Sequence, residues 1–329
     1  MTYTREKQVA IAAVTRAAQL CAAVRAEMVG AAFLQKEDKS PVTVADFGAQ
    51  ALICQLLAEV FPHDAIIAEE DAAELRKREN AGLLDQVASY VRRTLPNAAP
   101  RDICTWIDAG GSHPASRFWT LDPIDGTKGF LRNDQYAIAL ALIEDGEVAV
   151  GALACPALPL RLDSPAGEAG VLFVAVRGEG ATLALLRGGP ETPIHVATNG
   201  TGQRFVESVE AAHGDQQLQE EIARVVGITR PALQMDSQAK YGSVARGDAA
   251  LYLRLPSPKS PDYRENIWDH AAGSIIVEEA GGRISDMHGA ALDFTKGSKM
   301  YANRGVVVSN GIIHAAVIAA LSRQSGEYV

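Results

Sequence analysis

The run TLDPIDGT, residues 120–127, joins a short strand to an acidic corner. The β-prone residues from Phe118 onward predict the strand, and Pro123 stiffens the turn that follows it. The carboxylates of Asp122 and Asp125 therefore extend from one rigid corner. This stretch predicts a β-sheet in which the end of one strand carries two acidic groups.

The corner offers hard oxygen donors. The backbone carbonyl of Ile124 lies between Asp122 and Asp125, and Mg²⁺ prefers such oxygen ligands to nitrogen or sulfur. A zinc site is disfavoured, because no cluster of His and Cys in the sequence has the spacing of zinc ligands. Taken alone, the corner is consistent with a magnesium site or with a purely structural turn.

A phosphate site is expected beside this corner. Gly126 and Thr127 present backbone N–H groups at a turn or helix start, where a phosphate oxygen is held favourably. Two Mg²⁺ ions about 3.5–4 Å apart would activate a water and stabilise the leaving oxygen. Glu69 and Asp269 can supply the further carboxylates that two ions need. Either one alone is more simply a solvated turn or a helix cap.

Length and charge restrict the class of protein. A chain of 329 residues exceeds the usual limit of one core, so we expect two packed domains or one large layered domain. Pro and Gly cluster at residues 163–170, which predicts a boundary there, with domains at 1–165 and 166–329. The formal charge of −9 disfavours binding to long nucleic acid. A small anionic ligand would have to be met by a few focused cations or by metal ions.

Sequence features of membrane and redox proteins are not evident. Arg16 and Arg25 interrupt the apolar N-terminal stretch, and the apolar run 311–321 is too short to span a bilayer. The four cysteines form no Cys-x-x-Cys pair, so we expect reduced thiols buried as small apolar side chains. We expect a cytoplasmic monomer that does not bind membranes.

Hydrophobic periodicity predicts helices and strands in both halves of the chain, which indicates an α/β protein. The expected helices cover residues 6–28, 51–60 and 271–280, and the expected strands cover 65–68, 118–121, 136–143, 148–153, 249–255 and 306–308.

Two motifs resemble one phosphatase superfamily. The run at 120–127 resembles the signature of the lithium-sensitive, magnesium-dependent phosphatases, which include inositol monophosphatase and fructose-1,6-bisphosphatase. The stretch WDHAAG at 268–273, followed by EEAGG at 278–282, resembles a second signature of this superfamily. The resemblance extends from about residue 42 to residue 310. It implies a layered α-β-α-β-α sugar-phosphatase fold like that of inositol monophosphatase, with a mixed α+β first domain that binds metal and an α/β second domain that supplies Asp269.

Within this superfamily the second half of the chain resembles the 3'(2'),5'-bisphosphate nucleotidases. The stretches that carry this likeness are DSQAKY at 236–241, YLRLP at 252–256 and LDFTKG at 292–297. Enzymes of this branch remove the 3'-phosphate of 3'-phosphoadenosine 5'-phosphate and leave AMP. The resemblance implies a small nucleoside bisphosphate as substrate, two or three Mg²⁺ ions per site and sensitivity to lithium.

Motif positions in the family imply a role for each site residue. Asp46 and Thr127 would together take a proton from the attacking water. Motif position favours Glu69 as a ligand, whereas the chemistry of the residues alone leaves Glu69 and Glu70 as alternatives. The implied metal ligands are Glu69, Asp122, the carbonyl of Ile124, Asp125 and Asp269. The implied substrate contacts are Gly126, Thr127, His213, Ser237, Lys240 and Arg254.

If the family motifs are set aside, the basic residues of this set indicate different environments. Lys240 would be read as part of a solvated face, and His213 as an ordinary surface histidine. Arg254 lies within an apolar run, which indicates a buried anionic partner.

Three other functions are consistent with parts of the sequence. An aspartyl-phosphate phosphatase of the haloacid dehalogenase type is suggested by Asp125-Gly126-Thr127. Its two aspartates are separated by one residue, whereas Asp122 and Asp125 are separated by two. A phosphatase of the same superfamily that acts on inositol phosphates or a sugar bisphosphate is the second alternative. The third is a sensor that binds the nucleotide without hydrolysing it.

Overall fold

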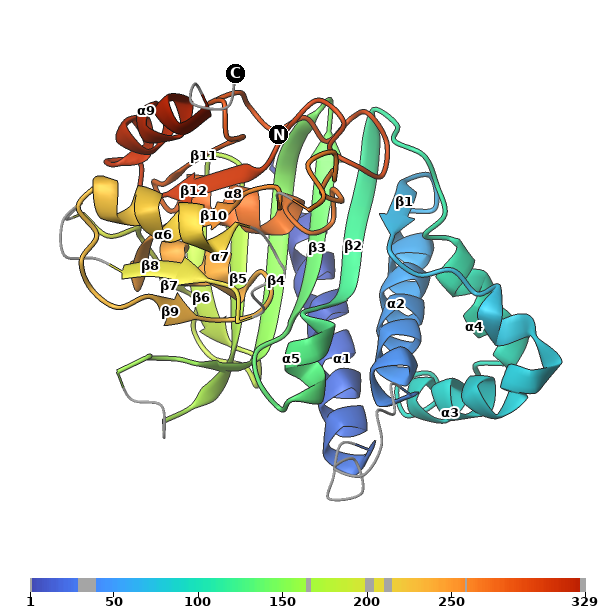
Figure 1. The fold of residues 1–329 in the computed structure, drawn as a ribbon. Coiled ribbons are helices and arrows are strands. Elements are labelled where there is room, and N and C mark those ends of the chain that lie inside the picture. The colour runs from blue at the N-terminus through green and yellow to red at the C-terminus, as the bar shows by residue number, and fades with distance from the viewer. Residues whose placement is uncertain are drawn as a thin grey trace.

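Five stacked layers of helices and sheets make up the part of the chain that the structure describes. The computed structural model describes residues 2–28, 40–163, 167–198, 204–209, 215–257 and 259–325. Helices cover one face of a large sheet, further helices fill the space between this sheet and a smaller one, and a last pair lies outside the smaller sheet (Figure 1). The α-β-α-β-α arrangement predicted from the sequence is confirmed.

The large sheet has seven strands in chain order. Strand β1 runs parallel to β2, and every later pair is antiparallel. The strands are β1 (Ala65–Ala68), β2 (Arg117–Asp125), β3 (Ala137–Glu144), β4 (Glu147–Pro159), β5 (Ala169–Val176), β6 (Gly180–Leu185) and β7 (Thr192–Pro193).

The smaller sheet has the order β11-β12-β10-β8-β9, in which β8 is parallel to β10 and to β9, and β12 is antiparallel to both of its neighbours. Its strands are β8 (Arg204–Glu207), β9 (Leu233–Gln234), β10 (Ala249–Arg254), β11 (Arg283–Ser285) and β12 (Val306–Ser309).

The helices divide among three layers and one corner. The first layer contains α1 (Thr4–Met28), α2 (Ser40–Val60), α3 (Ala81–Val91) and α4 (Pro100–Asp108), with short 3₁₀ turns at Glu74–Arg76 and Arg78–Asn80. The middle layer contains α7 (Ala239–Ala245) and α8 (Ala271–Glu279), and the outer layer contains α6 (Gln216–Val225) and α9 (His314–Ser325). A short helix, α5 (Thr127–Leu131), follows the end of β2.

The change from one sheet to the other falls between β7 and β8. The predicted division, at residues 165 and 166, lies outside the described residues. The strands on either side of it, β4 and β5, are paired neighbours in the large sheet.

Residue size alternates along β3 in step with the two faces of the sheet. Ile138, Leu140 and Leu142 pack toward α1 and α2, whereas the alanines between them face the middle layer. Small residues on this second face let α8 approach closely. A Cβ atom on Gly151 of β4 would lie 2.4 Å from Cγ2 of Ile275.

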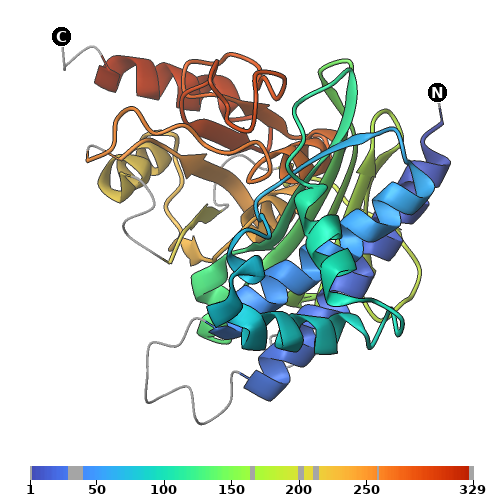
Figure 2. The same cartoon turned by 90° about the vertical axis from the view of Figure 1, so that its right-hand side faces the viewer.

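Helices α1 and α2 lie side by side across the first face of the large sheet (Figures 1 and 2). The stretches Thr4–Glu27 and Thr43–Val60 are long and apolar enough to span a membrane, by length and composition only. In the structure, 50% and 72% of their apolar windows are buried. Core helices of globular proteins meet the same criteria, so these stretches are weak evidence of a span.

Helix α2 begins earlier than the sequence pattern predicts. It starts at Ser40 rather than near residue 51, because Pro41 occupies the first turn, where its missing N–H costs no hydrogen bond. Asp46 consequently lies within the helix and does not open it.

The contact between α7 and α8 requires a glycine. We expect Gly273→Ala to lower the melting temperature, because its Cβ would lie 2.4 Å from Cγ of Tyr241, and such overpacking costs about 1–3 kcal/mol. Gly82→Ala is the control, since nothing lies within 4 Å of a Cβ there and alanine favours α3 by about 0.5–1 kcal/mol. Equal stability of Gly273→Ala and the parent protein in thermal unfolding would contradict this account.

Candidate active site

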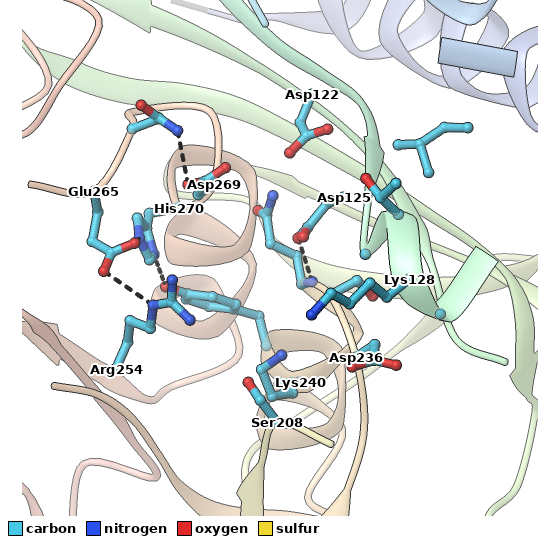
Figure 3. Close-up of a pocket in the computed structure, with 18 of the residues that line it drawn as sticks. Asp122, Asp125, Lys128, Ser208, Asp236, Lys240, Arg254, Glu265, Asp269 and His270 are labelled. Carbon is cyan, nitrogen blue, oxygen red and sulfur yellow. Dashed lines mark hydrogen bonds and ion pairs between the residues drawn. The ribbon is translucent and has the colours of Figure 1, made fainter. Parts of the chain in front are cut away.

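A pocket of about 450 Å³ lies where the two sheets meet the middle helices. The end of β2, the start of α5, the start of α7, the end of β10 and the segment before α8 all contribute to it (Figure 3). The structure brings most of the predicted residues together here. Those that line the pocket are Glu69, Asp122, Ile124, Asp125, Gly126, Thr127, Ser237, Lys240, Arg254 and Asp269.

A bulge in β2 aims both carboxylates of the corner into the pocket. Asp122 pairs with Ala139 and Asp125 pairs with Ala137, so three steps along β2 correspond to two steps along β3. In a regular strand, residues three apart point to opposite faces. The bulge adds one residue next to Pro123, so the side chains of both aspartates point to the same face of the sheet.

Gly126 is required at the end of this corner by both conformation and space. Its φ is +88°, in the left-handed region that favours glycine, and a Cβ there would lie 3.0 Å from Cβ of Ser237. Helix α5 begins at the next residue, Thr127. A turn or helix start at this point is therefore confirmed, and binding of phosphate to its N–H groups stays a prediction.

The start of α7 ties the corner to the second motif. Ser237 has a φ of 65°, which is strained for a residue with a Cβ, and the next backbone N–H, of Gln238, donates to Oδ2 of Asp125 at 2.6 Å. The Gln238 side chain donates to the carbonyl of Trp268 at 3.0 Å and accepts from the N–H of Gly273 at 3.2 Å. One residue therefore joins β2 to the segment that leads into α8.

Glu69, rather than Glu70, lines the pocket. The buried amide of Gln50 in α2 fixes this part of the backbone after β1. Its Oε1 accepts from the N–H of Glu70 at 3.0 Å, and its Nε2 donates to the Glu70 carbonyl at 2.6 Å. This clamp sets the direction of both glutamates, and it places Glu69 at the acidic side of the pocket.

The carboxylates of the pocket raise one another's pKa. Burial, and then the neighbouring Glu69, Asp125 and Asp269, hold the pKa of Asp122 well above its usual range. Burial and the charge of Glu70 raise the pKa of Glu69 to about 7. The pKa of Asp269 rises to about 7, mainly through burial.

A divalent cation fits this donor set. Asp122 is only 2% exposed, and its Oδ1 has no hydrogen-bond partner among the residues that the structure describes. Buried polar atoms normally have a partner, and a cation would supply one while offsetting the repulsion among the acids. The oxygen-only chemistry of Glu69, Asp122, Asp125, Asp269 and the Ile124 carbonyl suits a hard cation.

Two cationic side chains form the opposite side of the pocket (Figure 3). Burial lowers the pKa of Lys240 to about 8, and its Nζ donates to the carbonyl of Met235 at 3.3 Å. Nε of Arg254 donates to Oε1 of Glu265 at 3.0 Å. Burial opposes the charge of Arg254, but Glu265 outweighs this and raises the pKa of the guanidinium. Glu265 is thus the buried anionic partner that the apolar run around Arg254 predicts.

Asp46 lies behind the acidic side of the pocket and does not line it. Its side chain is 8% exposed in α2, and burial, together with Glu70 and Glu69, holds its pKa well above the usual range. Among the described residues, the structure gives no hydrogen bond between Asp46 and Thr127, so their pairing stays a prediction. His213 lies outside the described residues.

The structure adds residues that sequence reasoning missed. Asn266 donates to Oδ2 of Asp269 at 3.3 Å, and the ligand atoms of Glu265, Asp269 and His270 lie within 4.8 Å of one another. Gln238 belongs to a stretch already noted for its family likeness. The position of Arg254 predicts a buried anionic partner but does not identify it as Glu265. No sequence signal identifies Asn266.

Known proteins are similar to this chain over nearly its whole length. The model of the Inositol monophosphatase family matches residues 4–327. A 3'(2'),5'-bisphosphate nucleotidase of Schizosaccharomyces pombe is 44% identical, over 97% of this chain and 96% of that protein. A protein of the same name from Oryza sativa is 42% identical, over 97% and 94%.

Solved structures show the same fold. An inositol monophosphatase from Zymomonas mobilis superposes with a TM-score of 0.64 at 19% identity, over 98% of this chain and 99% of that one. The Thermotoga maritima IMPase gives a TM-score of 0.62 at 21% identity, over 96% of both chains. The matches extend over nearly the whole sequence, and the chain belongs to the inositol monophosphatase family.

Proposed function

We propose that this chain hydrolyses the 3'-phosphate of 3'-phosphoadenosine 5'-phosphate to give AMP and phosphate, in the manner of the relatives that are named for this activity. One observation carries the proposal. A single pocket contains an acidic corner on one side and, on the other, the buried Lys240 and the partly buried Arg254.

The two sides of the pocket match the two phosphates of such a substrate. The acidic corner, with its cation bound, accommodates the phosphate that is cleaved. Lys240 and Arg254 hold the phosphate that remains, because charge-assisted hydrogen bonds to an anion are strong in a buried site. An arginine presents its donors in a planar fork that suits phosphate geometry. Ser237 and Gly126 also line the pocket and are proposed to contact the substrate.

Mg²⁺ is the proposed cofactor, as two or three ions per site. Its ligands would be Glu69, Asp122, Asp125, Asp269 and the Ile124 carbonyl. When bound, Mg²⁺ supplies Lewis-acid chemistry, which lowers the pKa of water and neutralises charge on the phosphate. The chain itself holds these oxygens in place before the ion binds, through the β2 bulge and the Gln238 hydrogen bond to Asp125.

Asp46 and Thr127 are the proposed proton-accepting pair. Thr127 lines the pocket at the first residue of α5, and Asp46 lies within a buried acidic environment. A general base works best when its pKa is close to the working pH. The raised pKa of Asp46 moves it in that direction from the ordinary value of an aspartate.

The proposal includes one further substrate and leaves one alternative function. The sulfated analogue, 3'-phosphoadenosine 5'-phosphosulfate, presents the same phosphate for cleavage and is a proposed second substrate. Hydrolysis of an inositol phosphate is the alternative function, which the fold shared with inositol monophosphatases favours.

Substrate preference separates these functions. We expect phosphate release from 3'-phosphoadenosine 5'-phosphate to exceed release from inositol monophosphate and fructose bisphosphate, because only the first presents a second phosphate of a nucleotide to Lys240 and Arg254. Chelation of Mg²⁺ should abolish the release. A preference for the inositol substrate would contradict the proposal, and binding without AMP production would indicate a sensor.

Loss of the general base should slow turnover. We expect Asp46→Asn to lower kcat by about 10²–10⁴-fold while the protein keeps its fold, because an amide cannot accept the proton. Asp85→Asn, on the exposed side of α3, is the matched control and should keep parental kcat. Thermal unfolding of both variants checks the fold, and normal turnover of Asp46→Asn would exclude this role.

Removal of one repelling carboxylate should stabilise the metal-free protein. The pKa of Asp122 is raised in the folded state, so the ionised group destabilises the fold. This cost is absent below the ordinary pKa of about 3.8 and grows as the pH rises through the folded-state value. At pH 8 in EDTA we expect Asp122→Asn to melt above the parent.

Added Mg²⁺ should reverse that order, because the parent gains a bound cation and the variant loses a ligand. Differential scanning fluorimetry with and without Mg²⁺ measures both effects. Asp85→Asn again serves as the control, and it should follow the parent under both conditions. A parent protein that Mg²⁺ does not stabilise would count against the metal site.

A further inference from the structure

Glu265 lies between the two sides of the pocket and is held from two directions. The side chain is buried, with the residue 7% exposed. Its Oε1 accepts from Nε of Arg254 at 3.0 Å, and its Oε2 lies 3.5 Å from Nε2 of His270 (Figure 3). Neither the corner motif nor the proposed reaction uses this carboxylate.

The groups around Glu265 are themselves fixed. The hydroxyl of Tyr241 is 2.6 Å from Nδ1 of His270, and Tyr241 packs edge-on against Tyr252, with ring centroids 5.4 Å apart. Tyr252 lies on β10, two residues before Arg254. The contacts therefore run from Arg254 on β10 through Glu265 and His270 to Tyr241 on α7, and then back to Tyr252 on β10. This closed series restricts where Glu265 can move.

The backbone at Glu265 is anchored as well. Its carbonyl accepts from the N–H of Met300 at 2.9 Å, and the N–H of Ile267 donates to the carbonyl of Ser298 at 3.0 Å. Asp269 follows on the same segment. The carboxylate that holds Arg254 and a proposed metal ligand are thus carried by one anchored stretch of backbone.

Arg254 has a second possible partner nearby. Nε of Arg254 is 3.0 Å from Oε1 of Glu265, and a carboxylate oxygen of Glu265 lies within 4.8 Å of one of Asp269, so the guanidinium lies near both acids. A guanidinium with a choice of carboxylates pairs with the one that offers it the best geometry. If Arg254 paired with Asp269, it would occupy a metal ligand and leave the phosphate side of the pocket.

We propose that Glu265 is a positioning residue that holds Arg254 on the substrate side of the pocket and keeps it from pairing with Asp269. This inference rests on the proposed function only for the identity of the phosphate that Arg254 meets. The competition between Arg254 and a cation for Asp269 is independent of turnover.

A role for Glu265 as a metal ligand is the main alternative, since its ligand atom lies within 4.8 Å of those of Asp269 and His270. The contacts favour positioning. One oxygen of Glu265 is already bonded to Arg254, and a cation on this carboxylate would lie next to a guanidinium. A nearby positive charge opposes cation binding.

Glu265→Gln tests the proposal, because glutamine keeps the volume and an acceptor oxygen but removes the charge. We expect Mg²⁺ affinity, measured by calorimetry without substrate, to fall about tenfold, as is typical when a residue behind a ligand is changed. We also expect KM for the nucleoside bisphosphate to rise by a similar factor, with a smaller change in kcat.

The double variant Glu265→Gln with Arg254→Ala distinguishes positioning from ligation. With the arginine removed, its competition for Asp269 is removed too, so Mg²⁺ affinity should return close to the parental value. The effect of Glu265→Gln on KM should also disappear in the Arg254→Ala background. Mg²⁺ affinity that stays low in the double variant would identify Glu265 as a ligand and overturn the proposal, and additive effects on KM would overturn it too.

Glu278→Gln is the matched control. Glu278 also pairs with an arginine, with its Oε2 2.8 Å from Nη1 of Arg177, but Glu278 is exposed on α8 and neither residue lines the pocket. It should leave Mg²⁺ affinity and KM unchanged.

If Glu265→Gln fails to fold, Glu265→Asp keeps the charge with a shorter reach. It should then show a smaller loss of Mg²⁺ affinity that Arg254→Ala again restores, and a loss that Arg254→Ala leaves in place would overturn the proposal. A chain that binds Mg²⁺ as expected yet hydrolyses nothing would refute the proposed function alone.

Discussion

The hydrogen bond from the Gln238 N–H to Asp125 joins the two sheets at the site. Asp125 belongs to the large sheet, and Gln238 starts the helix that lies between the sheets. The strained backbone of Ser237 aims this N–H, and the Gln238 side chain extends the connection to the segment before α8. This contact fixes the acidic corner against α7, the helix that carries Lys240.

The site separates unlike charges that would otherwise neutralise one another. The acids of the corner repel, which raises their pKa values, while Lys240 and Arg254 lie a few side chains away. Direct pairing would be more stable for the fold than this separation. Glu265 and the anchored segment that follows it keep the two groups apart. This separation lowers the free energy of unfolding, and packing in the rest of the five layers offsets the loss.

The elements and the corner could be predicted from the sequence because their signals are local. The run 120–127 contains a strand, a proline-stiffened turn and two acids, and the structure has β2 and its bulge at that point. The continuation of the large sheet through β7 could not be predicted, since strand pairing is set by contacts far apart in the chain. The position of Arg254 predicted a buried anion, but only the structure identifies Glu265 among the acids nearby. The roles carried over from the family stay predictions for every site residue, Asp46 and His213 included.

The bulge in β2 makes the length of the acidic corner as important as its composition. Asp122 and Asp125 share a face only because one extra residue separates them relative to β3. Loss of a single residue between them would turn the second carboxylate toward α1 and α2, into an apolar layer. Substitution of Lys240 on α7 or Arg254 on β10 would change the cationic side of the pocket and leave the pairing of β2 with β3 as it is. The corner therefore tolerates the substitution of a side chain better than the insertion or deletion of a residue.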